Sequence, residues 1–257
     1  MTVSFAGEPA LAFLLASIRI VAWIAVVPPF SSRGVPPMVK VVLSLGLAFA
    51  AAPSVDGALI ATDTWSLVST AAVQVAIGVT MGFVTSLLFG AVAAAGSLVD
   101  VFGGFSLAQG FDPLSMNGST VFGTLHQMLA TALLFVSGGY LLVFGGLLKT
   151  FSVLPVGVTP EIGGAREVLT TAFVMFFVTA VQIALPLVVV LFVADLGLAL
   201  LTKVAPQLNA LSVMFPAKIG LTLLLVGMSF HLLPDVLRNV VDLALEAMSS
   251  LAGGATG

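Results

Sequence analysis

Two very long stretches of the chain contain no charged residue. They run from Thr64 to Val99 and from Pro113 to Leu148, and each is 36 residues long. A helix of that length extends about 54 Å, whereas the hydrocarbon core of a bilayer is about 30 Å thick and needs about 20 helical residues. Each stretch is therefore too long for one upright membrane span and too short for two spans joined by a turn.

Composition places the whole chain in the same class. Hydrophobic residues make up 60% of the 257 residues and charged residues only 7%, whereas about 25% of a soluble domain is charged. These values indicate an integral membrane protein, and we expect one domain, residues 1–257, because no polar linker divides the chain. Period-two alternation is absent and open sheet edges are not stable in lipid, so we predict an all-α fold.

The apolar segments and the prolines between them predict the order of the helices. Pro28 ends the first helix, Pro186 lies inside the fifth and Pro206 begins the turn to the sixth, because proline removes a backbone donor. Close helix approach is expected at the spaced small residues Gly78 with Gly82, Gly90 with Ala94, and Gly139 with Gly145. The predicted helices cover about 10–30, 38–54, 65–100, 120–150, 167–204 and 208–233, followed by a shorter amphipathic helix at 235–250.

Three charged residues interrupt the apolar runs. A charge at the centre of a lipid-facing helix costs at least about 2.5–3.5 kcal/mol, so we expect Arg19 to face protein, a cavity or an interface. Asp100 and Asp195 are candidates for a proton relay, although both could instead lie near helix ends or at water-filled surfaces. Neither has a basic partner at helical spacing, since Asp195 is eight residues from Lys203. We therefore predict that neither aspartate is an essential relay.

No motif predicts catalysis or a cofactor. His126 and His231 stand far apart without carboxylates at ligand spacing, so we expect each to be a polar residue on a helix packing surface and expect no metal site. A nucleophile elbow and a phosphate-binding glycine loop are both absent from the sequence. The small, scattered net charge of -3 gives no nucleic-acid footprint. The chain is thus not expected to be an enzyme, to hold a cofactor or to bind nucleic acid.

An ordered set of motifs resembles the FliR family of type III secretion export-gate proteins. The resemblance runs from about residue 10 to about residue 240. Each motif alone is weak, since proline and glycine are common in membrane helices, but the order is specific, and the PQLN element is the most specific part. The motifs are Arg19-Ile20, Pro28, Phe30, Pro36, Lys40, Gly96, Asp112-Pro113, Phe151 to Gly157, Ile183 to Pro186 and Lys203 to Gly220.

The resemblance implies a role in flagellar protein export. It implies long, broken helical hairpins, with a FliP-like part at about 10–170 and a FliQ-like part at about 171–257, packed in a helical hetero-oligomer. The implied partners are FliP, FliQ, and FlhB- and FlhA-like subunits, together with unfolded flagellar subunits in transit and membrane lipid. The implied location is the basal body of the flagellum, in the bacterial inner membrane. Helices packed in a complex raised above the bilayer need not match its thickness, which would explain the long runs.

The segment FGGFSLAQGFDPLSMNGS, from Phe102 to Ser119, is the candidate plug of a closed pore. Its glycines allow tight re-entrant turns, and its phenylalanines supply apolar bulk that blocks ions without covalent attachment. The resemblance implies the same role for this loop, and a packed connector without a gating role is the alternative. The plug residues singled out are Phe102, Gly103, Gly104, Phe105, Gly110, Phe111, Asp112 and Met116.

A second group is expected to shape hairpins and assembly contacts. In the PQLN turn, Gln207 and Asn209 can bond the backbone groups that the break leaves free, and Lys203 can lie near the last carbonyls of the preceding helix. A purely local capping role is the alternative. Lys203 stands where the family usually has an arginine. The group is Arg19, Pro28, Phe30, Pro36, Pro186, Lys203, Pro206, Gln207 and Asn209.

Three other functions remain open at this stage. A small secondary transporter would also have broken apolar segments and an acidic ion site, but it would normally have an internal repeat, which the sequence lacks. A membrane scaffold that serves only assembly is a further alternative. An injectisome export-gate homologue is poorly separated from a flagellar one by the sequence.

Overall fold

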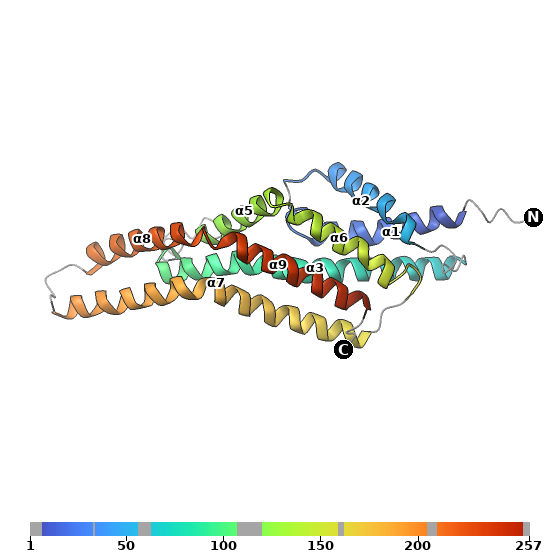
Figure 1. Cartoon of the computed structure of the whole chain (residues 1–257). Helices are drawn as coiled ribbons and strands as arrows, with labels where there is room; N and C mark the ends of the chain where they lie inside the picture. The colour runs from blue at the N-terminus through green and yellow to red at the C-terminus, as the bar shows by residue number, and fades with distance from the viewer. Residues whose placement is uncertain are drawn as a thin grey trace, which may run out of the picture. The chain divides into compact units, whose positions relative to one another are not determined.

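A computed structural model describes residues 7–32, 34–55, 63–106, 120–158, 162–204 and 210–253. Within these ranges the chain is built from helices and has no strand, which confirms the all-α prediction. In chain order (Figure 1) the elements are α1 (Gly7–Val26), α2 (Pro37–Ala51), the short 3-10 helix η1 (Ala52–Ser54), α3 (Thr64–Gly103), α5 (Val121–Val136), α6 (Gly139–Val153), α7 (Ile162–Val204), α8 (Ala210–Ser229) and α9 (Leu233–Gly253).

The helices have the lengths and composition of a multi-pass membrane protein. Four spans are long and apolar enough to cross a bilayer, and there are up to six if α5 with α6 and α8 with α9 each count as one interrupted span. Two helices exceed the bilayer thickness by far, since α3 has 40 residues and α7 has 43. The first charge-free run is therefore one helix that is longer than a bilayer span, whereas the described part of the second run is divided between α5 and α6.

The chain divides into two compact units, and several helices contribute to both. The first unit contains residues 1–89, 137–174 and 240–257, and its largest buried side chains include Trp23, Leu147 and Phe151. The second unit contains residues 90–136 and 175–239. Its buried cluster comprises Val99, Phe122, Leu187 and Val226, with Phe105, Leu125 and Leu225 packed against it.

Several predicted helix boundaries are wrong: α7 begins at Ile162 instead of about 167, and α8 ends at Ser229 instead of about 233. Two further errors have identifiable reasons. Helix α1 ends at Val26 instead of about residue 30, because Pro28 lacks a backbone donor and disfavours helical geometry in the residue before it. The predicted helix at 120–150 is two helices. Gly138 separates α5 from α6 with a φ of 72°, a left-handed geometry that glycine adopts without strain, and Gly139 N donates to Ser137 Oγ over 3.3 Å.

Only some of the spaced small residues mark close helix approach. In the first unit, a Cβ at Gly78 would collide with the carbonyl of Arg19, and one at Gly82 would lie 3.1 Å from the carbonyl of Trp23, so this prediction is confirmed. In the other two pairs, Gly90 and Gly145 do not mark close approach. A Cβ at Gly90 would make only an ordinary 3.7 Å contact with Phe176, and one at Gly145 would meet nothing within 4 Å.

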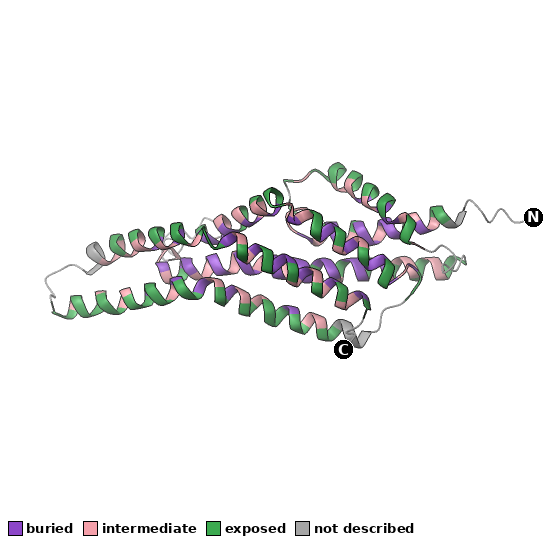
Figure 2. Ribbon diagram, in the orientation of Figure 1, coloured by how far each residue is buried: buried purple, intermediate pink, exposed green. Residues whose placement is uncertain are grey.

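Burial differs strongly between the long helices (Figure 2). Over an 18-residue apolar stretch of each helix, 56% of the residues are buried in α3 and only 22% in α7. Helix α7 exposes Phe192 and Leu200, and α8 exposes Leu223 and Met228. Apolar surface of this extent requires lipid or protein to cover it.

Candidate functional site

The candidate plug begins at the end of helix α3. The predicted end of this helix, about residue 100, is three residues too early, because Phe102 and Gly103 are still helical. Gly104, with a φ of 83°, then ends the helix in a Schellman motif: Phe105 N donates to Asp100 O over 3.0 Å, and Gly104 N donates to Val101 O over 3.4 Å. The four described residues that were predicted for the plug, Phe102, Gly103, Gly104 and Phe105, therefore form an ordered helix terminus.

Asp100 joins this terminus to the start of α5. Its Oδ2 accepts hydrogen bonds from Phe122 N at 2.9 Å and from Gly123 N at 3.3 Å, which are donors that the first turn of α5 cannot use internally. One turn earlier on α3, Ser97 Oγ lies 2.7 Å from Thr120 Oγ1. The two ends of the segment between α3 and α5 are thus held together.

Close packing reinforces the junction. A Cβ on Gly96 would collide with the carbonyl of Phe122, so only glycine allows α3 and α5 to approach this closely. The rings of Phe105 and Phe122 meet edge to face, with centroids 4.8 Å apart. Phe105 is half-buried against the apolar cluster of the second unit, so the first aromatic residue beyond α3 is packed against protein.

Asp100 and Asp195 both have partners, contrary to the expectation from the sequence. Asp100 is near a helix end but fully buried, and its partners are backbone amides that no side-chain spacing could indicate. Asp195 does have a basic partner, because Lys218 Nζ lies 2.7 Å from its Oδ2. The lack of partners was therefore the wrong reason for rejecting a relay role.

Asparagine can replace Asp100 as a hydrogen-bond acceptor, whereas alanine cannot. An asparagine at position 100 retains a carbonyl oxygen that can accept from Phe122 N and Gly123 N, whereas alanine leaves both amides unsatisfied at about 1–3 kcal/mol each. We therefore expect the free energy of unfolding of Asp100→Asn to lie within about 1 kcal/mol of the wild-type value. That of Asp100→Ala should be clearly lower. Thermal melting in detergent measures this, and equal melting temperatures of the two variants would contradict the capping role.

Arg19 faces protein, as predicted. Its side chain is fully buried in the first unit, where Nε donates to Gln74 Oε1 over 2.7 Å and Nη2 donates to Leu154 O over 3.0 Å. The guanidinium also lies 4.3 Å from the ring centroid of Phe151. Gln74 and Leu154 are partners that sequence reasoning missed, because they lie 55 and 135 residues away along the chain.

The other predicted assembly residues are dispersed. Phe30 stacks on Phe144 with centroids 5.2 Å apart, Pro36 precedes α2, Pro186 lies inside α7, and Lys203 is exposed in the last turn of α7. Pro28 follows α1 in the Pro28-Pro29 pair. The residues that lie outside the described ranges are Gly110, Phe111, Asp112, Met116, Pro206, Gln207 and Asn209.

Metal ligands do not gather in the part of the chain that the structure describes. No group of three or more histidine, cysteine, aspartate or glutamate side chains lies close enough there to hold an ion. His126 is buried with its Nδ1 2.8 Å from Phe122 O, as expected for a packing position, whereas His231 is exposed. In the described part of the chain, the polar residues singled out above form helix junctions and polar contacts within the apolar core.

Comparison with known proteins finds relatives among bacterial export proteins. The profile of a family described as "Bacterial export proteins, family 1" matches residues 10–244. The chain is 31% identical to flagellar biosynthetic protein FliR of Escherichia coli K12 over 237 residues, which are 89% of this chain and 91% of that protein. It is 28% identical to the FliR of Bacillus subtilis 168 over 93% of this chain and 94% of that protein.

Proteins of another secretion system are also similar. Yop proteins translocation protein T of Yersinia pestis is 26% identical over 227 residues, or 85% of each chain. The similarity thus extends over most of the chain in both flagellar and non-flagellar relatives.

Proposed function

This chain belongs to the family of bacterial export proteins, family 1, and from that membership we propose that it is a core component of the flagellar type III export gate. A relative named for flagellar biosynthesis matches 89% of the chain, and relatives named for secretion or translocation match 61% and 85%, which supports a role in a type III export apparatus as the common role. The flagellar system is favoured because identity to the Escherichia coli FliR reaches 31% over most of the chain.

The gate would be built with FliP and FliQ in the bacterial inner membrane, next to FlhB- and FlhA-like subunits. Residues of about 10–170 would form the FliP-like part and residues of about 171–257 the FliQ-like part. Exposed apolar side chains on α7 support the presence of neighbours, because its 43 residues carry more apolar surface than one bilayer crossing requires. Unfolded flagellar subunits would pass through the assembled pore.

The proposed role of the segment from Phe102 to Ser119 as the plug rests on one observation. Both of its ends are held at one place, since Asp100 accepts hydrogen bonds from the first amides of α5 and Ser97 lies against Thr120. A segment with adjoining fixed ends can enter a pore and return without disturbing the helices that bear it. Its apolar side chains would then exclude ions and water in the closed state.

Removing the plug should make the gate leak while leaving it assembled. We expect deletion of Gly104 to Gly110, or the double substitution Phe105→Ala and Phe111→Ala, to raise the potassium chloride conductance of the complex in planar bilayers, because small ions then meet no apolar barrier. Copurification with FliP and FliQ, measured in parallel, reports assembly. A plug-less complex that assembles and stays sealed would refute the plug, and failure of the wild-type chain to copurify would refute the gate.

A further inference from the structure

The end of α3 rests on helix α8 within the second unit. A Cβ on Gly103 would lie 2.8 Å from Thr222 Cγ2, so the backbone of Gly103 is in direct contact with that side chain. The next residue, Gly104, faces Lys218: its Cβ position lies 3.6 Å from Lys218 Cδ and 3.8 Å from Cε. Two successive residues at the terminus thus face two side chains one turn apart on α8.

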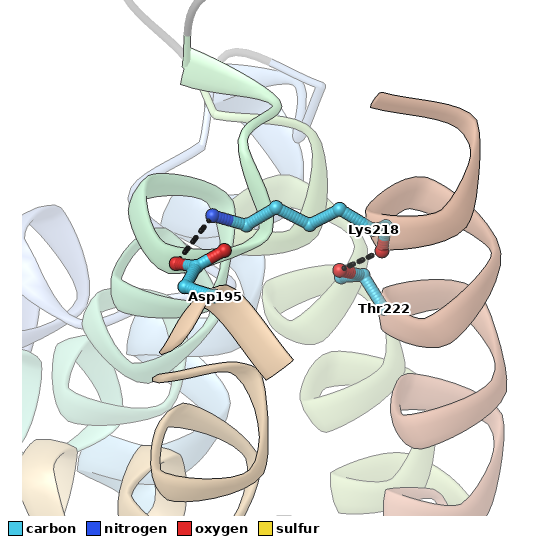
Figure 3. Close-up of polar contacts among 3 residues, drawn as sticks. All are labelled: Asp195, Lys218 and Thr222. Atoms are coloured by element: carbon cyan, nitrogen blue, oxygen red, sulfur yellow. Dashed lines mark hydrogen bonds and ion pairs between the residues drawn. The ribbon is translucent and has the colours of Figure 1, made fainter. Parts of the chain in front are cut away.

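Thr222 is held in its orientation. Its side chain is fully buried, and Oγ1 donates to Lys218 O over 2.8 Å (Figure 3). In this orientation Cγ2 and Oγ1 lie 2.8 Å and 3.0 Å from the Cβ position of Gly103. Any side chain larger than glycine at position 103 would clash with it. The contact depends on the absence of a side chain at the terminus of α3.

Lys218 is held by Asp195 of α7. The side chain extends from α8 toward α7 and ends 2.7 Å from Asp195 Oδ2 (Figure 3). The two side chains are only 20% and 33% exposed, so the pair is screened by water less than a surface pair. A free lysine side chain has many rotamers, and this ion pair selects the extended one whose Cδ and Cε lie beside the open side of Gly104.

We propose that Asp195 and Lys218 are positioning residues that hold the terminus of α3, Gly103 and Gly104, on the α7–α8 hairpin, and that the seal of the gate depends on this hold. The inference rests on the proposed function, because the candidate plug begins at this terminus. Asp195, an acidic residue in the apolar helix α7, then binds the ammonium group of Lys218 and so fixes the direction of the lysine stem.

Substitutions at Lys218 separate charge from packing. We expect Lys218→Met, which keeps an apolar stem but loses the ion pair, to raise the conductance of the assembled complex about tenfold. A tenfold change corresponds to a free energy between those of surface and buried ion pairs. Asp195→Asn should act in the same direction, and Lys218→Arg should remain sealed because it keeps both stem and charge. The matched control is Arg238→Met, which breaks the exposed pair with Asp235 at 3.3 Å.

A disulfide can replace the ion pair. The natural chain has no cysteine, and the Cβ position of Gly103 lies 3.4 Å from Thr222 Cβ, close to the spacing of about 3.5–4.5 Å in disulfides. In the Lys218→Met background, Gly103→Cys with Thr222→Cys should seal the complex when oxidised and let it leak again when reduced. The same cysteine pair beside an intact Lys218 reports any disturbance that the cysteines themselves cause.

The outcomes distinguish this inference from the plug. If Lys218→Met assembles and stays sealed while the double substitution Phe105→Ala and Phe111→Ala leaks, the positioning role is wrong and the plug stands. If Lys218→Met leaks equally in the oxidised and reduced cysteine forms, the hold on α3 is not the cause of the leak and the inference fails. If the plug-less complex is sealed, the plug and the inference that depends on it are both refuted.

Discussion

Replacing Gly78 with leucine is expected to force α1 away from α3 in the first unit. A Cβ at this position would collide with the carbonyl of Arg19 and lie 2.9 Å from Ala22 Cβ, and a backbone carbonyl inside a helix cannot turn aside. Alanine alone should cost about 1–3 kcal/mol, and leucine more, because every added carbon enters occupied space. The folding free energy of a domain is only about 5–15 kcal/mol, so the leucine variant should largely fail to fold.

Gly46 provides the matched control for this substitution. It also lies in a helix, α2, but a Cβ there would meet nothing within 4 Å. Gly46→Leu should melt at or slightly above the wild-type temperature, because leucine favours helix more than glycine does by about 0.8–1 kcal/mol. The measurement is the yield and melting temperature of the purified chain in detergent. A Gly78→Leu protein that folds and melts like the control would contradict the close packing.

Arg19→Ala is expected to have an effect of similar size from a different cause. The substitution leaves Gln74 Oε1 and Leu154 O buried without their donors, at about 1–3 kcal/mol for each acceptor. It also empties the space beside Phe151, and such cavities add to the loss. We expect a total destabilisation of about 3–6 kcal/mol.

Two further variants identify the cause. In Arg19→Met with Gln74→Leu, apolar side chains fill the space and one unsatisfied acceptor is removed, so part of the lost stability should return, as it does when buried ionic groups are replaced as a set. Arg238→Ala removes an arginine that is 75% exposed and should change stability by less than about 1 kcal/mol. Melting temperatures that are equal for Arg19→Ala and Arg238→Ala would show that the buried contacts contribute nothing.

Part of the second-unit site could have been predicted from the sequence. Gly104 carries the signature of a helix C-terminus, a glycine followed by an apolar residue, and the structure places a Schellman motif there. The pairing of Lys218 with Asp195 could also have been predicted. Asp195 lies nine residues before the end of α7, and Lys218 lies eight residues after the start of α8. Residues at equal distance from the turn of a helical hairpin lie level with each other, so the predicted hairpin already implied this pair.

The partners of Asp100 and Arg19 were beyond such reasoning. Asp100 binds backbone amides, and every residue except proline has one, so no residue type marks Phe122 or Gly123 as its partner. Arg19 depends on Gln74 of α3 and on a carbonyl at Leu154 after α6, and no periodicity connects these positions.

The sequence by itself determined the class of this protein and the location of most helix breaks. Long charge-free runs are stable only in an apolar environment, and a proline removes a backbone donor wherever it occurs, so both features act locally and can be read without coordinates. Only the tertiary structure decided which small residues lie at close contacts, because Gly78 and Gly145 are the same residue in similar apolar helices and differ only in what faces them. It also decided which polar partners Arg19 and Asp195 have, since the cost of a buried charge depends on partners that folding brings from distant parts of the chain.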